Sequence, residues 1–332
     1  MGDPGELQVS LADIEAAARL LAGRIRRTPL LAADGLAPRR GELRLKCENL
    51  QVVGAFKARG AMHHLLRLFE RDPKLKARGV ATYSSGNHGT ALAWAARELG
   101  AAATVFVPED IPAGKRSAIE RFGGRVVPAG RTSRDRREAC EAAREREGFS
   151  IVPPFDDPWI VAGQGTCGLE LVEQVPDVKR VLVPVGGGGL IAGIAVAVRS
   201  KRPDVEIVGV EPVAAASMQA ALHAHRPVEI AAGETIADGL KPVQVGALNH
   251  AIAARLVSRV VTVDDAAIRQ AMRLLLERCK LVVEPSGAAT VAAWLAHDDV
   301  AAGGATVAVL SGGNVDFERL VRLLSERPTC PA

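Results

Sequence analysis

Lys57 lies in a segment whose residue types could give it a reactive amine. The run Gly54-Ala55-Phe56-Lys57-Ala58-Arg59-Gly60-Ala61 predicts a helix over residues 56–68, with the lysine in its first turn beside an aromatic ring. A lysine in a partly apolar, positively poised site has a lowered pKa and can form a Schiff base with a carbonyl group. A lysine on a helix is usually only solvated, so this segment by itself leaves both interpretations open.

A glycine-rich segment leaves an apolar strand and enters a helix. It reads Val185-Gly186-Gly187-Gly188-Gly189-Leu190. Glycines there let the backbone approach a phosphate, while free N–H groups and the helix dipole favour the anion. Gly187, Gly189 and Ala192 also fit a dinucleotide fingerprint, and Glu211, about 20 residues further on, would then bind the ribose. A tight turn without any ligand is the third interpretation.

A third segment, Ser84-Ser85-Gly86-Asn87-His88-Gly89, again lies between a strand and a helix. Two hydroxyls, an amide and a helix N-terminus together make a pocket suited to a carboxylate. The alternative is an ordinary helix cap made by the side chain of Ser85 or Asn87.

The elements that must position these segments follow a regular order. Ser10 followed by Asp13 predicts the start of a helix over residues 11–25. Valine-rich strands that alternate with helices of about ten residues predict parallel βαβ units in open α/β sheets. Prolines interrupt this alternation at residues 153–158, which predicts a crossing between two lobes. The expected strands cover residues 43–46, 79–83, 102–107, 125–127, 181–185 and 206–210, and the expected helices cover 90–99, 113–122, 134–147 and 190–198.

Composition and charge exclude several classes of function. A net charge of +4 without a basic tail and an aromatic content of 3% argue against a nucleic-acid partner. The arginines of residues 131–146 alternate with acids, which predicts a solvated helix face. The apolar stretches are shorter than the ~20 residues of a membrane span, so we expect no membrane partner. Five scattered cysteines predict reduced thiols in a cytoplasmic protein.

Taken together and in this order, the segments resemble the fold-type II pyridoxal-phosphate enzymes, and among them the threonine and serine dehydratases and the serine racemases. The resemblance implies a two-lobed α/β fold like that of the tryptophan synthase β chain, with open, mostly parallel sheets flanked by helices. A large discontinuous domain would take residues 1–68 and 154–332, and a small domain would take residues 69–153. The motifs that carry the resemblance, besides the three above, are Arg27-Thr28-Pro29-Leu30, Lys46-Cys47-Glu48, Pro154-Phe155-Asp156-Asp157-Pro158, Ala162-Gly163-Gln164-Gly165-Thr166, Glu234-Thr235-Ile236-Ala237-Asp238-Gly239, Glu284-Pro285-Ser286-Gly287-Ala288 and Ser311-Gly312-Gly313-Asn314-Val315-Asp316.

The resemblance implies a cofactor site. Lys57 would hold pyridoxal 5'-phosphate as a Schiff base, with Phe56 packed beside it. Asn87 would hydrogen-bond the ring hydroxyl, and Ser311 would face the pyridine nitrogen. The loop glycines would hold the phosphate: Gly186, Gly187, Gly188 and Gly189.

It also implies where a substrate binds. Ser85, Asn87 and His88 would offer hydroxyl, amide and backbone donors to the substrate carboxylate. Ser85 would also be a catalytic residue on the cofactor face opposite Lys57. A homodimer is expected from the resemblance, and the chain end soon after Ser311 predicts a catalytic core without a C-terminal regulatory domain.

A metal site is expected to be poor. Relatives that bind a divalent cation have an acidic pair after the corresponding Glu-Pro step. Here Glu211-Pro212 leads into an alanine run and Ser217, with no second carboxylate. A hard cation wants several oxygen ligands. Glu211 with a backbone carbonyl and Ser217 would supply too few.

The implied activity is that of a dehydratase, which converts L-threonine or L-serine to 2-oxobutyrate or pyruvate plus ammonia. Serine racemase is an alternative, because Lys57 and Ser85 on opposite faces would make an acid/base pair. A threo-3-hydroxyaspartate dehydratase is another, in which Arg136 would meet the second carboxylate rather than lie in solvent on its helix. An NAD-dependent dehydrogenase would use the glycine loop but not Lys57 or Ser311. A non-catalytic binding protein would be expected to lack Lys57.

Overall fold

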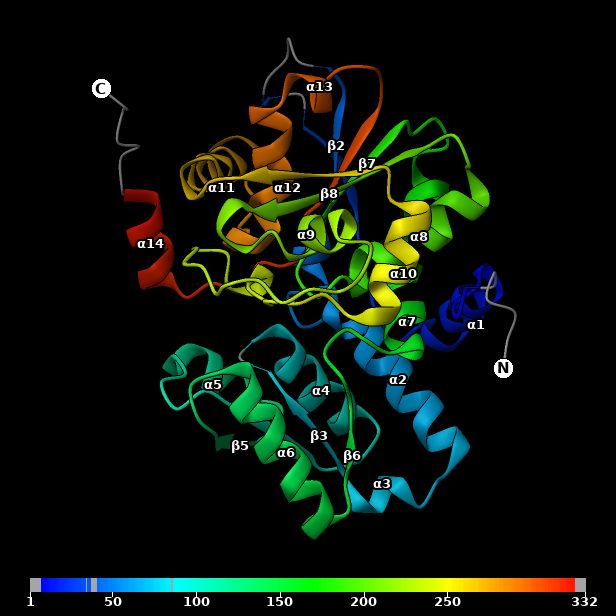
Figure 1. Ribbon diagram of the computed structural model, residues 1–332, viewed down its shortest axis with the longest axis vertical. Helices are drawn as coiled ribbons and strands as arrows, with labels where there is room; N and C mark the ends of the chain where they lie inside the picture. Colours follow the sequence, from blue (N-terminus) through cyan, green and yellow to red (C-terminus); the bar gives the residue numbers. More distant parts are fainter. Residues whose placement is uncertain (1–6, 34, 37–40, 85, 326–332) are drawn as a thin grey trace.

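The protein is represented by a computed structural model that describes residues 7–33, 35–36, 41–84 and 86–325. It contains two separate sheets, each flanked by helices, which lie one above the other in Figure 1. This is the mixed α/β architecture with parallel sheets that the sequence predicts. The domain boundaries proposed above, after residues 68 and 153, stay a prediction.

The larger sheet has six strands in the order β1-β2-β10-β7-β8-β9, and only the pair β1–β2 is antiparallel. Alternate residues of its strands enter two cores, as the pleat of a buried strand requires. Val181 and Val183 pack with α7 and α8, whereas Leu182 between them packs with α11 and α12. The strands are β1 (Leu30–Ala32), β2 (Leu43–Lys46), β7 (Arg180–Pro184), β8 (Glu206–Pro212), β9 (Arg259–Val263) and β10 (Thr306–Val309); the helices are α1 (Leu11–Leu21), α7 (Pro158–Gln174), α8 (Gly189–Lys201), α9 (Ser217–His223), α10 (Ala247–Leu256), α11 (Asp265–Cys279), α12 (Pro285–Ala296), α13 (Asp298–Ala301) and α14 (Phe317–Ser325).

The smaller sheet has four parallel strands in the order β5-β4-β3-β6. Val80 and Val105 face α2 and α4, while Ala81 and Phe106 face α6. The strands are β3 (Val80–Tyr83), β4 (Ala103–Val107), β5 (Arg125–Pro128) and β6 (Ser150–Ile151); the helices are α3 (Leu75–Arg78), α4 (Asn87–Glu98), α5 (Ala113–Glu120) and α6 (Ser133–Glu147).

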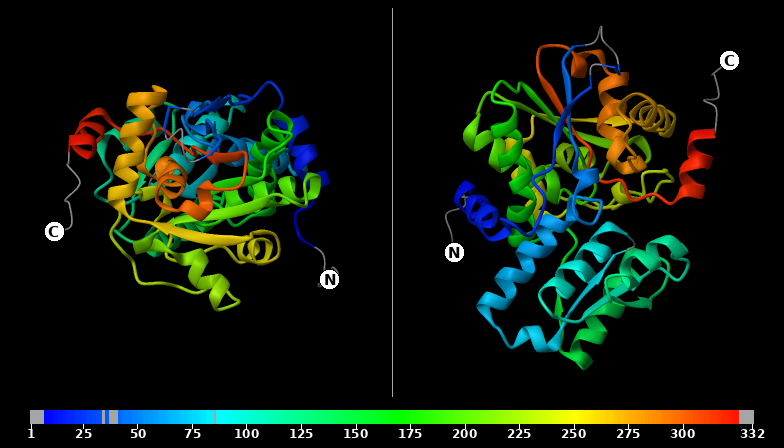
Figure 2. Two further views of the ribbon diagram at one scale, coloured as in Figure 1. Left: turned by 90° about the horizontal axis from the view of Figure 1, so that it is seen from above. Right: turned by 180° about the vertical axis from the view of Figure 1, so that it is seen from behind.

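Helix α2 (Lys57–Arg71) joins the two halves, since it packs on both α7 and α4. Figure 2, seen from behind, shows it in light blue at the boundary. Its first turns cross α7 at close range, because a Cβ on Gly163 would lie 2.7 Å from the Cα of Gly60. Glycine at this crossing lets the two backbones approach, so α7 fixes the end of α2 that begins at Lys57.

Several local expectations can be compared with the structure. Ser10 and Asp13 form the predicted capping box, although α1 ends at Leu21 rather than at residue 25. The helix expected over 90–99 begins earlier, at Asn87. The cysteines of the described residues are free thiols, as expected, and Cys330 lies outside those residues. No helix in the described part of the chain is long and apolar enough to cross a membrane.

Candidate active site

Lys57 is the first residue of α2, and its amine is partly buried. Its Nζ donates a hydrogen bond to the carbonyl oxygen of Pro154 at 2.6 Å and lies 5.1 Å from the centre of the Phe56 ring. Burial lowers the pKa of Lys57 to about 8. A proton therefore leaves this amine far more readily than it leaves an exposed lysine, which is the property that a Schiff-base lysine requires.

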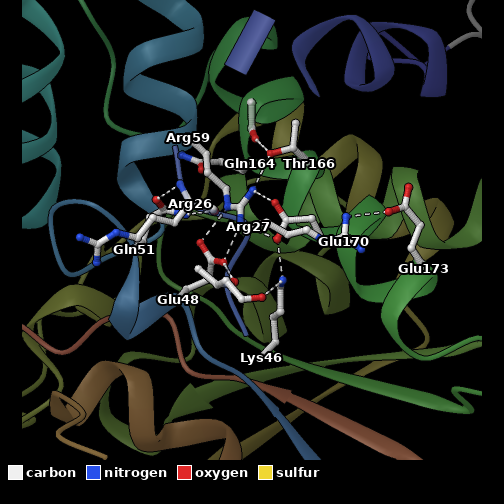
Figure 3. A network of polar contacts seen from close by, with 12 residues as sticks. Arg26, Arg27, Lys46, Glu48, Gln51, Arg59, Gln164, Thr166, Glu170 and Glu173 are labelled. Carbon is white, nitrogen blue, oxygen red and sulfur yellow. Dashed lines mark hydrogen bonds and ion pairs between the residues drawn. The ribbon is translucent and has the colours of Figure 1, made fainter. Parts of the chain in front are cut away.

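Figure 3 shows a network of opposite charges that includes Arg59, two residues after Lys57 on α2, and most of its charges are buried. Arg59 donates two hydrogen bonds to Glu48, each of 2.8 Å, and two to Glu170, of 2.7 and 3.0 Å. The Nζ of Lys46 donates to Glu170 at 2.6 Å and to the carbonyl of Thr28 at 2.9 Å. The two cations are matched by two carboxylates, and the network ties the segment before β1, β2 and α7 to the first turn of α2.

The glycine loop, residues 186–189, connects β7 to the N-terminus of α8. Gly188 has φ +92°, and a Cβ on Gly187 would overlap the ring of Phe155. The side chain of Asn249 holds the loop by donating to the carbonyl of Gly187 at 2.8 Å. The backbone N–H groups of this loop donate to no other described residue. Unpaired donors at a helix N-terminus suit a phosphate group, so the loop fits the cofactor that the sequence predicts.

Ser311 follows β10 and is 4% exposed. Its carbonyl accepts a hydrogen bond of 3.0 Å from the N–H of Phe56, and Ala55 pairs with Gly312 in an isolated bridge. The segment that carries Lys57 and the segment that carries Ser311 are therefore joined by backbone contacts, although they lie far apart in sequence.

Asn87 and His88 begin α4. The cap residue of this helix is Gly86, without a side-chain hydrogen bond, so Asn87 is not the cap that the alternative interpretation required. Its Nδ2 instead donates to Glu284 at 2.7 Å. His88 is buried with its Nε2 3.3 Å from the carbonyl of Val152. Burial and the nearby charge of Lys57 lower the pKa of His88 to about 3, so its ring is neutral at ordinary pH.

Ser85, predicted as a catalytic and substrate-binding residue, lies outside the described residues. Ser84 follows the carboxyl end of β3, and Gly86 precedes α4. The glycine loop and Ser311 follow the carboxyl ends of β7 and β10, which is where ligands bind in open α/β sheets. Lys57, the glycine loop, Asn87 and Ser311 thus share one region between the two sheets.

Glu211 caps a helix. Its Oε1 accepts from the N–H of Met218 at 2.8 Å, and its Oε2 accepts from the N–H of Gln219 at 2.9 Å, at the start of α9. Burial raises the pKa of Glu211 to about 7. Within the described ranges no three His, Cys, Asp or Glu side chains are grouped so that they could hold a metal ion.

Arg136 does not lie in solvent as the charge pattern predicted, because it is 8% exposed. Its guanidinium donates to the carbonyl of Arg131 at 3.2 Å and to the hydroxyl of Ser133 at 2.8 Å, and its Nε has no hydrogen-bond partner in the described part of the chain. Among the described residues no carboxylate pairs with it, and burial lowers the pKa of Arg136. It lies in the first turns of α6, at the same edge of the small sheet as the Asn87 segment.

Sequence reasoning missed several residues that surround the site. Glu284 and Asn314 both bond to Asn87, yet they were singled out only as parts of motifs. Asn249 had no sequence signal at all. A link between the two halves was also missed: Lys115 on α5 pairs with Asp238 at 2.9 Å.

Comparison with known proteins places the chain among relatives of known activity. Residues 21–312 match the family model described as pyridoxal-phosphate dependent enzyme. The chain is 43% identical over 298 residues to an L-threonine ammonia-lyase from Geobacter sulfurreducens, covering 90% of this chain and 73% of that protein. It is 38% identical over 308 residues to an L-threo-3-hydroxyaspartate ammonia-lyase from Saccharomyces cerevisiae, covering 92% and 94%. The solved structure of maize serine racemase superimposes with a TM-score of 0.90 at 34% identity, over 95% of this chain and 96% of that one.

Proposed function

This chain belongs to the pyridoxal-phosphate dependent enzyme family, and we propose that it is an ammonia-lyase that dehydrates and deaminates L-threonine or L-serine. The products would be 2-oxobutyrate or pyruvate together with ammonia. The observation that carries the proposal is Lys57, a partly buried lysine of lowered pKa at the start of α2. Its amine bonds the carbonyl of Pro154, and the next residue, Phe155, packs on a glycine loop whose N–H groups donate to no described residue.

The cofactor is pyridoxal 5'-phosphate, and the residues present fit it. The glycine loop would hold the phosphate, and Lys57 would bond the aldehyde carbon. Asn87 would donate to the ring oxygen, and Ser311 would face the pyridine nitrogen. When bound, the cofactor supplies an electron sink that allows the Cα–H bond of an attached amino acid to break.

The chain's own residues then direct the reaction. With a substrate held on the cofactor, the Lys57 amine would be free to take the Cα proton, and a pKa of about 8 suits a base at ordinary pH. The backbone around Asn87 and His88 would hold the substrate carboxylate at the start of α4. A serine hydroxyl at the ring nitrogen, unlike a carboxylate, would not keep that nitrogen protonated, and this favours prompt loss of the β-hydroxyl over transamination.

Keto-acid formation tests the proposal. The purified protein with pyridoxal phosphate would be supplied separately with L-threonine, L-serine, D-serine and both threo-3-hydroxyaspartates. Rapid 2-oxobutyrate or pyruvate from the L-amino acids, lost in Lys57→Ala, would support the proposal. If no keto acid forms from any of them, the dehydratase is wrong, and chiral analysis of recovered serine would then test for a racemase that uses Lys57 and Ser85.

Arg136 supports a second candidate, a threo-3-hydroxyaspartate dehydratase. A buried guanidinium without a carboxylate partner is costly unless a ligand supplies the anion. One of the similar proteins is named for this activity. If Arg136 receives the second carboxylate, Arg136→Met should lower kcat/KM for L-threo-3-hydroxyaspartate ~100-fold and leave L-threonine nearly unchanged. Equal losses for both substrates would contradict this role.

A further inference from the structure

Three polar side chains form a continuous chain of hydrogen bonds beside the site. The Nδ2 of Asn314 donates to the carbonyl of Val53 at 2.8 Å and to the Oδ1 of Asn87 at 2.9 Å. The Nδ2 of Asn87 in turn donates to Oε1 of Glu284 at 2.7 Å. The members come from the loop after β10, from the start of α4 and from the residue that precedes α12.

The relay formed by Asn314, Asn87 and Glu284 has one possible direction, which the backbone carbonyl of Val53 fixes. The oxygen of Val53 can only accept, so it must face the amide nitrogen of Asn314. The other hydrogen of that nitrogen points at Asn87, which must therefore present its oxygen. The amide nitrogen of Asn87 is then left to face Glu284. The orientation of both amides follows from this network, although oxygen and nitrogen of an amide look alike by shape.

Two glycines leave the room that the relay needs. Gly54 has φ +73°, and a Cβ there would overlap the amide of Asn314. A Cβ on Gly312 would overlap the carboxyl of Glu284. Backbone bonds hold both glycines: the carbonyl of Gly54 accepts from the N–H of Gly313 at 2.9 Å, and the carbonyl of Gly312 accepts from the N–H of Glu284 at 3.1 Å. The relay is thus built into the loops that surround Lys57 and Ser311.

We propose that Asn314 and Glu284 are positioning residues that hold Asn87 as a hydrogen-bond donor toward the ring oxygen of the cofactor. This inference rests on the cofactor site proposed above. Asn87 uses one of its two Nδ2 hydrogens on Glu284 and keeps the other for a ligand oxygen. A donor at this point stabilises the ionised form of the ring oxygen and so lowers the pH at which it loses its proton.

The relay does not depend on the charge of Glu284. Burial raises the pKa of its carboxyl to about 7, while Asp238 raises it further and Lys115 and Arg319 oppose the rise. An oxygen of a neutral carboxyl still accepts a hydrogen bond. Because the donor from Asn314 occupies the amide oxygen side of Asn87, the amide keeps its direction in either state.

The decisive test compares two substitutions of Asn314. Asn314→Asp preserves the shape of the side chain but cannot donate a hydrogen bond. Its carboxylate would face two acceptor oxygens, those of Val53 and Asn87. Asn314→Ala only removes the amide group. We expect kcat to fall ~10-fold in Asn314→Ala and further in Asn314→Asp, with KM within about twofold of the wild type. The pH midpoint of the absorbance of the bound cofactor should rise by about one unit in both variants.

A space-filling role predicts the opposite order, because aspartate has the shape of asparagine and alanine does not. An Asn314→Asp protein with the spectrum, pH midpoint and kcat of the wild type would overturn the proposal. Circular dichroism would show whether each variant folds. Should Asn314→Asp fail to fold, Glu284→Ala serves instead: it should shift the midpoint in the same direction, whereas Glu284→Gln, which keeps an acceptor, should match the wild type. The exposed Glu173→Gln is the control for the substitution itself.

Lys57→Ala separates failure of the relay from failure of the site. A wild-type cofactor band that Lys57→Ala abolishes, but that the Asn314 and Glu284 variants leave unchanged, would overturn the relay and keep the site. A wild-type protein whose cofactor band does not depend on Lys57 would overturn both.

Discussion

Two buried arginines, Arg59 and Arg136, belong to regions with different electrostatic character. Arg59 is fully buried and donates five hydrogen bonds, four of them to carboxylates, and these carboxylates raise its pKa (Figure 3). Arg136 is almost as buried, has no carboxylate partner among the described residues, and has a lowered pKa. Lys57 resembles Arg136 in this respect, since among the described residues only the carbonyl oxygen of Pro154 accepts a hydrogen bond from it.

The difference indicates that the charge network of Arg59 is structural, whereas Lys57 and Arg136 belong to the candidate site. In that network each buried charge is paired inside the protein, so the network has no capacity left for a ligand. Neither Lys57 nor Arg136 donates a hydrogen bond to a carboxylate among the described residues, and burial lowers the pKa of both. Burying such a cation costs the folded protein stability, and groups with shifted pKa values of this kind are candidates for a functional site. Substitution by methionine, which removes charge and keeps length, tests this distinction position by position.

The largest effect is expected for Arg59→Met. The substitution leaves Glu48 and Glu170 buried without their shared cation, which should lower the free energy of unfolding by about 3–5 kcal/mol. Urea unfolding followed by circular dichroism measures the change. Arg67→Met on the same helix is the matched control, because its pair with Glu70 is exposed and should cost at most about 1 kcal/mol. Equal losses of unfolding free energy in Arg59→Met and Arg67→Met would contradict the structural role of the buried network.

Lys57→Met should have the opposite sign in the cofactor-free protein. The pKa of Lys57 is about 8 when folded and near 10.5 when unfolded, so below pH 8 the charged amine costs the folded state stability. Between these two pH values the unfolded chain binds more protons, and the stability of the wild type rises with pH. We therefore expect Lys57→Met to be more stable by roughly 1–3 kcal/mol at pH 7, with the advantage disappearing toward pH 10.5. Unfolding curves at both pH values would show it, and a variant less stable at pH 7 would contradict it.

Arg136→Met should change stability by less than about 1 kcal/mol, in either direction, because no buried carboxylate loses a partner. The control on the same helix is the exposed Arg134→Met. Thermal unfolding without substrate would compare both with the wild type. A loss of stability as large as that of Arg59→Met would show that Arg136 has a structural role rather than a ligand-binding role.

The smallest effect is expected where charges are half exposed. Lys115 and Arg319 both contact Asp238 and lower its pKa to about 2, and the Lys115 contact crosses the boundary between the two halves. Lys115→Gln should cost roughly 0.2–1 kcal/mol, and less at high salt. Unfolding at low and high ionic strength measures this, and a loss that salt does not reduce would show that the contact acts through packing.

The sequence predicted the parts of the site that are contiguous in the chain. Lys57 and the glycine loop each depend on a run of a few residues between predictable elements. The relay could not be found that way, because its three members come from positions 87, 284 and 314 and meet only in the folded chain. Arg136 is an instructive error: its neighbours pair as the charge pattern predicted, but Arg136, Cys140 and Ala143 are spaced by four and three residues and form the buried stripe of α6.

Helix α2 fixes the position of the Lys57 amine relative to the two halves. Its first turns are clamped to α7 through Arg59 and the Gly60–Gly163 crossing, while Leu65 and Leu68 further along belong to the core of the smaller sheet. The helix has 15 residues and is about 22 Å long, and Lys57 lies at the end that packs on α7. A swing of about 10° around that end would move the far end by roughly 4 Å and leave Lys57 almost still. A change in the angle between the two halves around this end of α2 would therefore leave the Lys57 amine almost in place.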